Sequence, residues 1–243
     1  MEFRTINNCG KLGFDFSIGE GVGKRIVKDF SKNLIQNIVK RSTKYFDESN
    51  KKEHIFSYGE RQLHSVVCPS IADLTDYYVM EQPVMRKPHG EDEYSGHIDY
   101  WIYYRDYTIL MELKHCYFAY NNSNPNIRIS EKFNNSLKQL NDVKMDECRE
   151  LTENYDKGLI KIALQTIVFY QSSQNHISNK DLKDKDFEED FDRLILNTDL
   201  NESNFKSLWL LHDRLNEPEK FNVNYFELYQ AVAFVGKVYD VIK

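Results

Sequence analysis

The feature that most constrains this chain is a pair of adjacent β-rich runs between residues 96 and 118. The segment reads GHIDYWIYYRDYTILMELKHCYF, and the polar pair Arg105–Asp106 separates its two apolar and aromatic halves. If these two residues form the loop, the halves pair as an antiparallel hairpin, because the length of a hairpin loop fixes the register. One face is then entirely apolar or aromatic, as a sheet surface against a core requires: it pairs Tyr104 with Tyr107, Ile102 with Ile109, Tyr100 with Met111, and Ile98 with Leu113.

The opposite face of this hairpin carries charge, with Asp99 opposite Glu112 and His97 opposite Lys114. Carboxylates placed directly opposite one another have Cβ atoms about 4.5–5.5 Å apart and repel. A divalent cation removes the repulsion, since Mg²⁺ is held by one or two carboxylates together with water and phosphate oxygens. The ammonium of Lys114 can reach a phosphate or a metal-bound water on the same face. The alternative is a solvated salt-bridge face, and the apolar residues around Glu112 favour the metal site over it.

The order of these residues resembles the PD-(D/E)XK nuclease superfamily. The matching residues are Asp99 in GHIDYW, Glu112 and Lys114 in MELKH, and Glu60 in YGERQLHSVV, over about residues 56 to 170. The resemblance implies a restriction-endonuclease-like mixed β-sheet flanked by helices and Mg²⁺-dependent cleavage of DNA or RNA, with Mn²⁺ as a substitute. It also implies that Asp99, Glu112 and Glu60 bind the metal and that Lys114 positions the attacking water. Ile98 stands where the namesake motif has proline.

Three secondary candidates have an alternative structural interpretation. Glu60 near a helix start either contacts the metal or interacts with the helix dipole. His97 either binds substrate or is a neutral cross-strand neighbour of Lys114. Gln139 in SLKQLNDVK could match a substrate-binding glutamine that some related nucleases carry on the helix after the Glu-x-Lys strand, although the accompanying tyrosine is absent. For Lys138 nearby we prefer a solvated helix face.

The remaining pattern predicts a single domain of mixed α and β structure (α/β in the broad sense, α+β in detail). We expect an N-terminal helical extension over residues 1–55, forming one compact unit with a nuclease-like domain over 56–243. In the second helix, Pro69 should produce a kink or a break. The expected helices are 24–46, 57–75, 129–151 and a short one around 187–194; the expected strands are 77–86, 96–118, 158–170 and 205–211, with strand or helix both open for the C-terminal apolar run.

Composition narrows the function classes. The net charge of −6 counts against a dedicated nucleic-acid-binding protein, which is usually basic, and counts less against a nuclease with a local basic surface. No stretch approaches the roughly 18–20 apolar residues of a membrane helix. The four scattered cysteines contain no CxxC pair and indicate reduced thiols, so we expect a cytoplasmic protein. The expected partner is nucleic acid, DNA first, with a protein partner or a homodimer left open. The alternative function is an inactive nuclease-like binding or regulatory protein.

Overall fold

The computed structural model describes ten segments of the chain: residues 1–19, 21–50, 53–90, 92–119, 127–144, 158–173, 187–198, 200–216, 219–222 and 225–239. Its centre is one mixed β-sheet with the strand order β1-β2-β7-β9-β6-β5-β4-β3, and β8 pairs with an end of β9. The β5–β6 pair is parallel, and the other strand pairs are antiparallel. The strands are β1 (Glu2–Ile6), β2 (Gly10–Phe16), β3 (Tyr78–Arg86), β4 (Tyr94–Tyr104), β5 (Tyr107–Ala119), β6 (Gly158–Ser173), β7 (Phe205–Leu211), β8 (Glu219–Asn222) and β9 (Tyr225–Val238).

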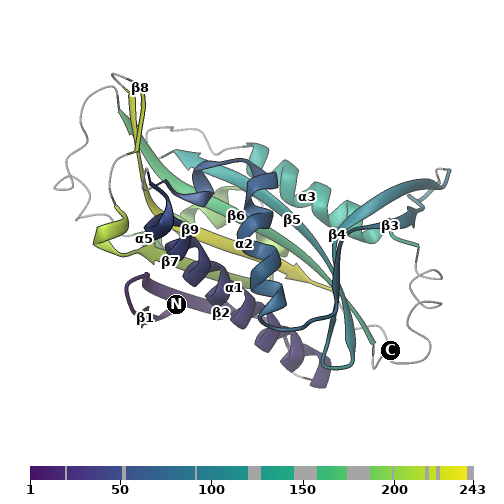
Figure 1. The fold of residues 1–243 in the computed structure, drawn as a ribbon. Helices are drawn as coiled ribbons and strands as arrows, with labels where there is room; N and C mark the ends of the chain where they lie inside the picture. Colours follow the sequence, from purple (N-terminus) through teal and green to yellow (C-terminus); the bar gives the residue numbers. More distant parts are fainter. Residues whose placement is uncertain are drawn as a thin grey trace.

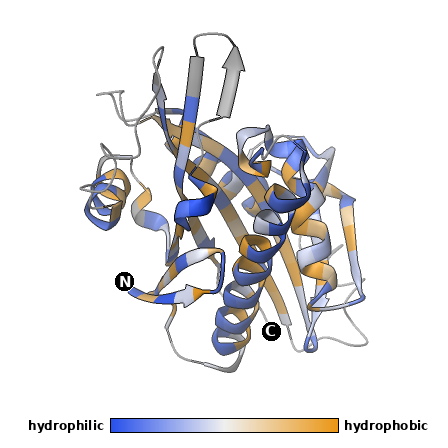
Figure 2. Cartoon of the chain, turned by 60° about the vertical axis from the view of Figure 1, so that its left-hand side comes forward, coloured by the Kyte–Doolittle hydropathy of each residue, from blue (hydrophilic) through white to orange (hydrophobic). Residues whose placement is uncertain are grey.

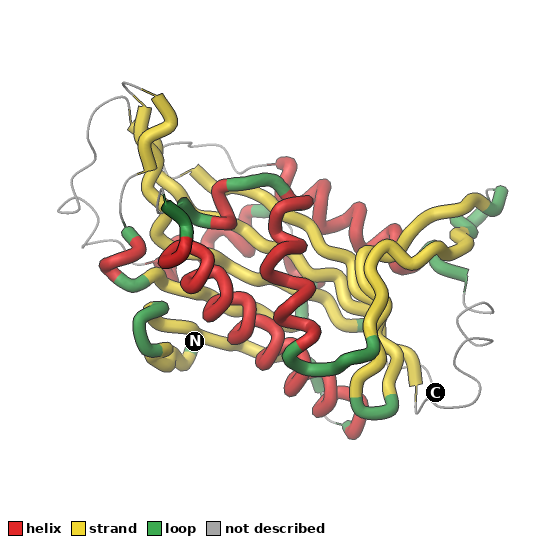
Figure 3. Tube along the Cα trace, viewed as in Figure 1, coloured by secondary structure: helices red, strands yellow, loops and turns green. Residues whose placement is uncertain are grey.

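Helices cover both faces of the sheet (Figures 1 and 3). On one face lie α1 (Val22–Glu48) and α2 (Glu60–Ala72), whose apolar side chains share one core with residues such as Tyr100 and Trp209. On the other face lie α3 (Ile127–Asn141) and α5 (Phe187–Asn197), with Phe133 and Phe191 in a second core. Figure 2 shows the strands largely hydrophobic between these helices, and α1 largely hydrophilic on its outer side. Short 3-10 turns span Ile55–Ser57, Leu200–Glu202 and Asp213–Leu215.

The mixed α/β class in a single domain is confirmed, and several element predictions need correction. The first 55 residues are not purely helical, because β1 and β2 precede α1 and join the central sheet. Pro69 lies inside α2 without splitting it, and the helix ends three residues later at Ala72. The helix expected over 129–151 ends at Asn141, and residues 145–151 lie outside the described segments. The C-terminal apolar run is the strand β9.

The hairpin register predicted from the sequence is confirmed next to the loop, whereas the predicted pairs Ile98–Leu113, Asp99–Glu112 and His97–Lys114 are not part of the ladder. Arg105 and Asp106 have φ values of 49° and 63°, the left-handed pair that a two-residue hairpin loop requires. The β4–β5 ladder then runs from Tyr104–Tyr107 to Tyr100–Met111 and ends there. Beyond this point β4 continues with β3 alone, and the two strands project past the sheet as an arm (Figure 1). The strand β3 contains Pro83 and is the last strand of the sheet, the position where a sheet tolerates proline.

Candidate functional site

The candidate site lies where β4 leaves β5. Beyond the end of the β4–β5 ladder, two backbone amides of β5 have no partner on β4. Side-chain carboxylates accept their hydrogen bonds instead. The Leu113 N–H donates to Asp99 Oδ2 at 2.7 Å, and the His115 N–H donates to Glu60 Oε2 at 3.1 Å. Glu60 is the first residue of α2, so the start of that helix is fixed against the open edge of β5. Two of the predicted residues, Asp99 and Glu60, therefore meet because buried amides at a sheet edge need acceptors.

Lys114 occupies the centre of this arrangement. Its Nζ lies 3.5 Å from Glu60 Oε1, 3.7 Å from Asp99 Oδ2 and 3.7 Å from Glu112 Oε2. The same ammonium donates to the carbonyl of Leu113 at 3.0 Å. The side chain of Lys114 is 15% exposed, and that of Glu112 is 2% exposed. Asp99, Glu112, Lys114 and Glu60 thus form one cluster, as the sequence predicted.

Arg86, which the sequence analysis missed, forms a buried ion pair with Glu112. The Arg86 Nη2 lies 2.8 Å from Glu112 Oε1 and also donates to the carbonyl of His97. The guanidinium passes directly over Gly96, where an added Cβ would lie 2.5 Å from Arg86 Nε. A glycine in β4 is therefore required for Arg86, at the end of β3, to reach Glu112 on β5. A basic residue closing the apolar strand YVMEQPVMR is the sequence signal that could have identified it.

The charges of the cluster alter the ionisation of its members. Burial, followed by the nearby Asp99 carboxylate, raises the pKa of Glu112 to about 7, although Lys114 and Arg86 oppose this shift. Burial lowers the pKa of Lys114, but Asp99, Glu60 and Glu112 together outweigh burial and leave that pKa raised. Lys114 is consequently a cation near neutral pH, suited to stabilising negative charge and unsuited to accepting a proton.

A hollow of about 350 Å³ opens beside this cluster. Residues of α2, β4, β5 and α3 line it. The predicted Gln139 lies in this hollow, whereas His97 is exposed and is not among the lining residues. The β4–β5 ladder ends before His97 and Lys114 could pair, which explains the difference. The lining residues are Glu60, Tyr94, Lys114, Lys132, Asn135, Lys138, Gln139 and Asp142.

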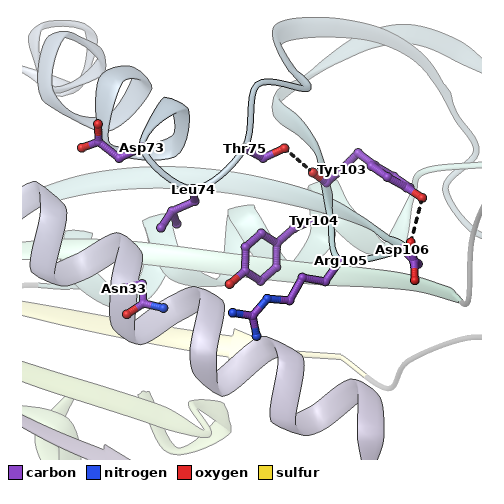
Figure 4. A pocket seen from close by; sticks show the side chains of 8 residues that line it. All are labelled: Asn33, Asp73, Leu74, Thr75, Tyr103, Tyr104, Arg105 and Asp106. Carbon is purple, nitrogen blue, oxygen red and sulfur yellow. Dashed lines mark hydrogen bonds between the residues drawn. The ribbon is translucent and has the colours of Figure 1, made fainter.

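A second hollow, of about 470 Å³, lies at the other end of β4 (Figure 4). Its side chains satisfy one another: Thr75 donates to the carbonyl of Tyr103, and the Tyr103 hydroxyl donates to Asp106. Arg105 pairs with Asp29 and lies over the ring of Tyr104. This hollow lacks a convergent set of charged groups among its lining residues, so the functional argument rests on the first one.

The donors around Lys114 suit a hard divalent cation. Three carboxylates and the Leu113 carbonyl are all oxygen ligands of the kind that Mg²⁺ prefers. When Glu112 is ionised, three carboxylates against the two cations Lys114 and Arg86 leave one net negative charge for an ion to neutralise. Within the described segments, however, no three His, Cys, Asp or Glu side chains are grouped as ligands of one ion. The acids surround the ammonium here, so metal binding would require Lys114 to move aside.

No family model, curated protein or solved structure matches this chain. Among the described helices, none is long and apolar enough to cross a membrane.

Proposed function

We propose that this protein is a metal-dependent nuclease that hydrolyses phosphodiester bonds in nucleic acid. The observation that carries the proposal is the convergence of Asp99, Glu112, Glu60 and the Leu113 carbonyl on the Lys114 ammonium, beside a hollow with further lysines. Charged and neutral oxygen atoms are the ligands that Mg²⁺ requires, and an ammonium group beside them can stabilise the phosphodiester.

The residues divide the work as follows. Asp99, Glu112 and Glu60 would hold Mg²⁺, with Mn²⁺ as a substitute, and Arg86 would keep Glu112 in place. The bound ion would supply a water of lowered pKa and neutralise charge on the phosphate. Lys114, which remains protonated, would hold the attacking water and stabilise the negative charge that develops on the phosphoryl oxygens.

The second candidate is a nuclease-like binding or regulatory protein without catalysis. It is favoured by one specific observation: each acid of the cluster already has a protein partner. Asp99 accepts from Leu113, Glu60 accepts from His115, and Glu112 pairs with Arg86. A cluster neutralised in this way can be purely structural.

Cleavage of single- and double-stranded oligonucleotides and of supercoiled plasmid, with Mg²⁺ or Mn²⁺, tests the proposal. We expect cleavage by the wild type and a loss of at least about a hundredfold in Lys114→Met and Asp99→Asn, the size of effect seen when a charge-stabilising group is removed. Asp73→Asn is the matched control, because it removes an exposed carboxylate paired with Arg41 outside the cluster.

Metal binding and cleavage together separate the two candidates. Calorimetric binding of Mn²⁺ that disappears in Asp99→Asn supports the nuclease. Cleavage that is equally strong in Lys114→Met and in the wild type would contradict the assignment of the site, and absence of both Mn²⁺ binding and cleavage would favour the binding protein.

A further inference from the structure

We infer that the hollow beside the cluster accommodates an unpaired nucleotide, so that the substrate is single-stranded nucleic acid. This inference rests on the proposed function and specifies its substrate class. It rests on three kinds of side chain that line the hollow: an exposed tyrosine, several lysines and a glutamine.

The first of these side chains is the exposed aromatic ring of Tyr94. Tyr94 begins β4, lies opposite Arg86 on the two-stranded arm, and has 45% of its surface exposed. The arm is fixed to the end of α3, because Lys87 N–H donates to the Asp142 carbonyl at 2.6 Å and Lys144 N–H donates to the Met85 carbonyl at 2.9 Å. The backbone that carries the ring is therefore held next to the cluster. A nucleobase can stack on such a ring only if its own face is uncovered, as in a single strand.

The second kind of side chain in the lining is lysine. Lys132 and Lys138 of α3 face the hollow together with Lys114, and the acids in the lining are Glu60 and Asp142. The cluster acids offset the charge of Lys114, so the basic character of the hollow comes from Lys132 and Lys138, on a chain whose net charge is −6. Lys132 is held in place by donating to the carbonyl of His115 at 2.9 Å. This basic surface is small and can contact only a few phosphates of one strand. Long duplex DNA generally binds a longer basic surface.

The third side chain, Gln139, has an unsatisfied polar atom, which indicates binding of the edge of a base. Gln139 lines the hollow, and its Oε1 is buried without a hydrogen-bond partner in the described part of the chain. Buried acceptors of this kind are rare and call for a donor. A rotation of the side-chain amide would turn this oxygen into the hollow. There the amino and imino groups on the pairing edge of a nucleobase would be such donors, and they are accessible only when the base is unpaired.

Fluorescence anisotropy in EDTA tests this inference without requiring cleavage. The probes are a labelled mixed-sequence 12-nucleotide single strand, long enough to extend beyond the hollow, and the blunt duplex formed with its complement. We expect the single strand to bind at least about tenfold more tightly. Tyr94→Ala should lose about tenfold of that affinity, and Tyr94→Phe should retain it, because the phenyl ring preserves the stacking surface. Tyr77→Ala is the control, since Tyr77 is also an exposed tyrosine (70%) and is not among the residues that line the hollow.

The outcomes distinguish this inference from the nuclease proposal. Equal affinity for both probes, no binding of either probe, or an unchanged Tyr94→Ala would overturn the inference. Selective binding of the single strand without cleavage in Mn²⁺ would support the inference and count against the proposed catalysis. Cleavage of duplex alone would support the proposed catalysis and count against the inference of a single-stranded substrate.

Discussion

At the scale of single residues, the ion pair between Arg86 and Glu112 is the feature on which the cluster most depends. Both side chains are almost completely buried, at 4% and 2% exposure. Desolvation of two charges offsets much of their attraction, so such a pair adds little net stability over an apolar pair of similar volume. Removing Arg86 is different, because Glu112 remains buried and loses its hydrogen-bonded cation, with only the more distant Lys114 left beside it.

Arg86→Met should therefore lower the free energy of unfolding by about 3–5 kcal/mol, the usual result of breaking a buried pair. The double variant Arg86→Met with Glu112→Leu should recover most of this loss, because no unpaired charge remains. Urea denaturation followed by circular dichroism provides the measurement. Arg41→Met is the control: its pair with Asp73 is 35% and 44% exposed, and such pairs contribute about 0–1 kcal/mol. A loss in Arg86→Met as small as that in Arg41→Met would contradict this account.

At the scale of elements, the site exists because two paired strands separate. The β4–β5 ladder follows the predicted register as far as Tyr100–Met111, and side-chain carboxylates then serve the amides of Leu113 and His115. The same carboxylates face Lys114, so the structural and the proposed chemical roles of Asp99 and Glu60 coincide. The separation also leaves the β3–β4 arm free to position Tyr94 beside the hollow.

Amide hydrogen exchange measured by NMR tests this separation. The Leu113 amide should exchange about tenfold faster in Asp99→Ala than in the wild type, because a hydrogen bond to a charged acceptor contributes about 1.5–3 kcal/mol. Asp99→Asn should show a smaller change, since its amide oxygen still accepts. The Ile109 amide, which lies within the β4–β5 ladder, is the internal reference. Identical Leu113 exchange in the wild type and Asp99→Ala would mean that this hydrogen bond is not important.

At the scale of the whole molecule, the N-terminal segment is part of the sheet. β2 pairs with β7 from Gly10–Leu211 to Phe16–Phe205. The indole N–H of Trp209 donates to the carbonyl of Cys9 at 2.8 Å, which connects residues 200 positions apart. Leu12 is 1% exposed and belongs to the core beneath α1 and α2. Residues 1–55 should consequently not unfold separately.

We expect Leu12→Ala to cost about 2–5 kcal/mol, the usual range for a large-to-small change in a core. Trp fluorescence and far-UV circular dichroism should report a single coincident transition that shifts by the same amount in this variant. Leu196→Ala is the control, because Leu196 is 70% exposed and should change stability by less than about 0.5 kcal/mol. An earlier separate transition for the N-terminal part would contradict this expectation.

The sequence by itself determined what depends on neighbours along the chain. Alternation of apolar residues and a two-residue loop were sufficient for the register of β4 and β5 as far as Tyr100–Met111. The same pattern placed Asp99, Glu112 and Lys114 near one another, although the predicted strand pairing of Asp99 with Glu112 does not form. Helical periodicity was sufficient for α1, and Glu60 became a candidate through the resemblance to the PD-(D/E)XK superfamily.

Tertiary structure decided the rest, because contacts between distant segments leave no periodic signal. Only the folded chain determined where the β4–β5 ladder ends, that Arg86 crosses Gly96 to reach Glu112, and that β2 joins the sheet beside β7. The exclusion of His97 from the hollow has the same cause. A side chain's partners across a diverging pair of strands depend on the packing of β3 and α3 around them, which no local pattern encodes.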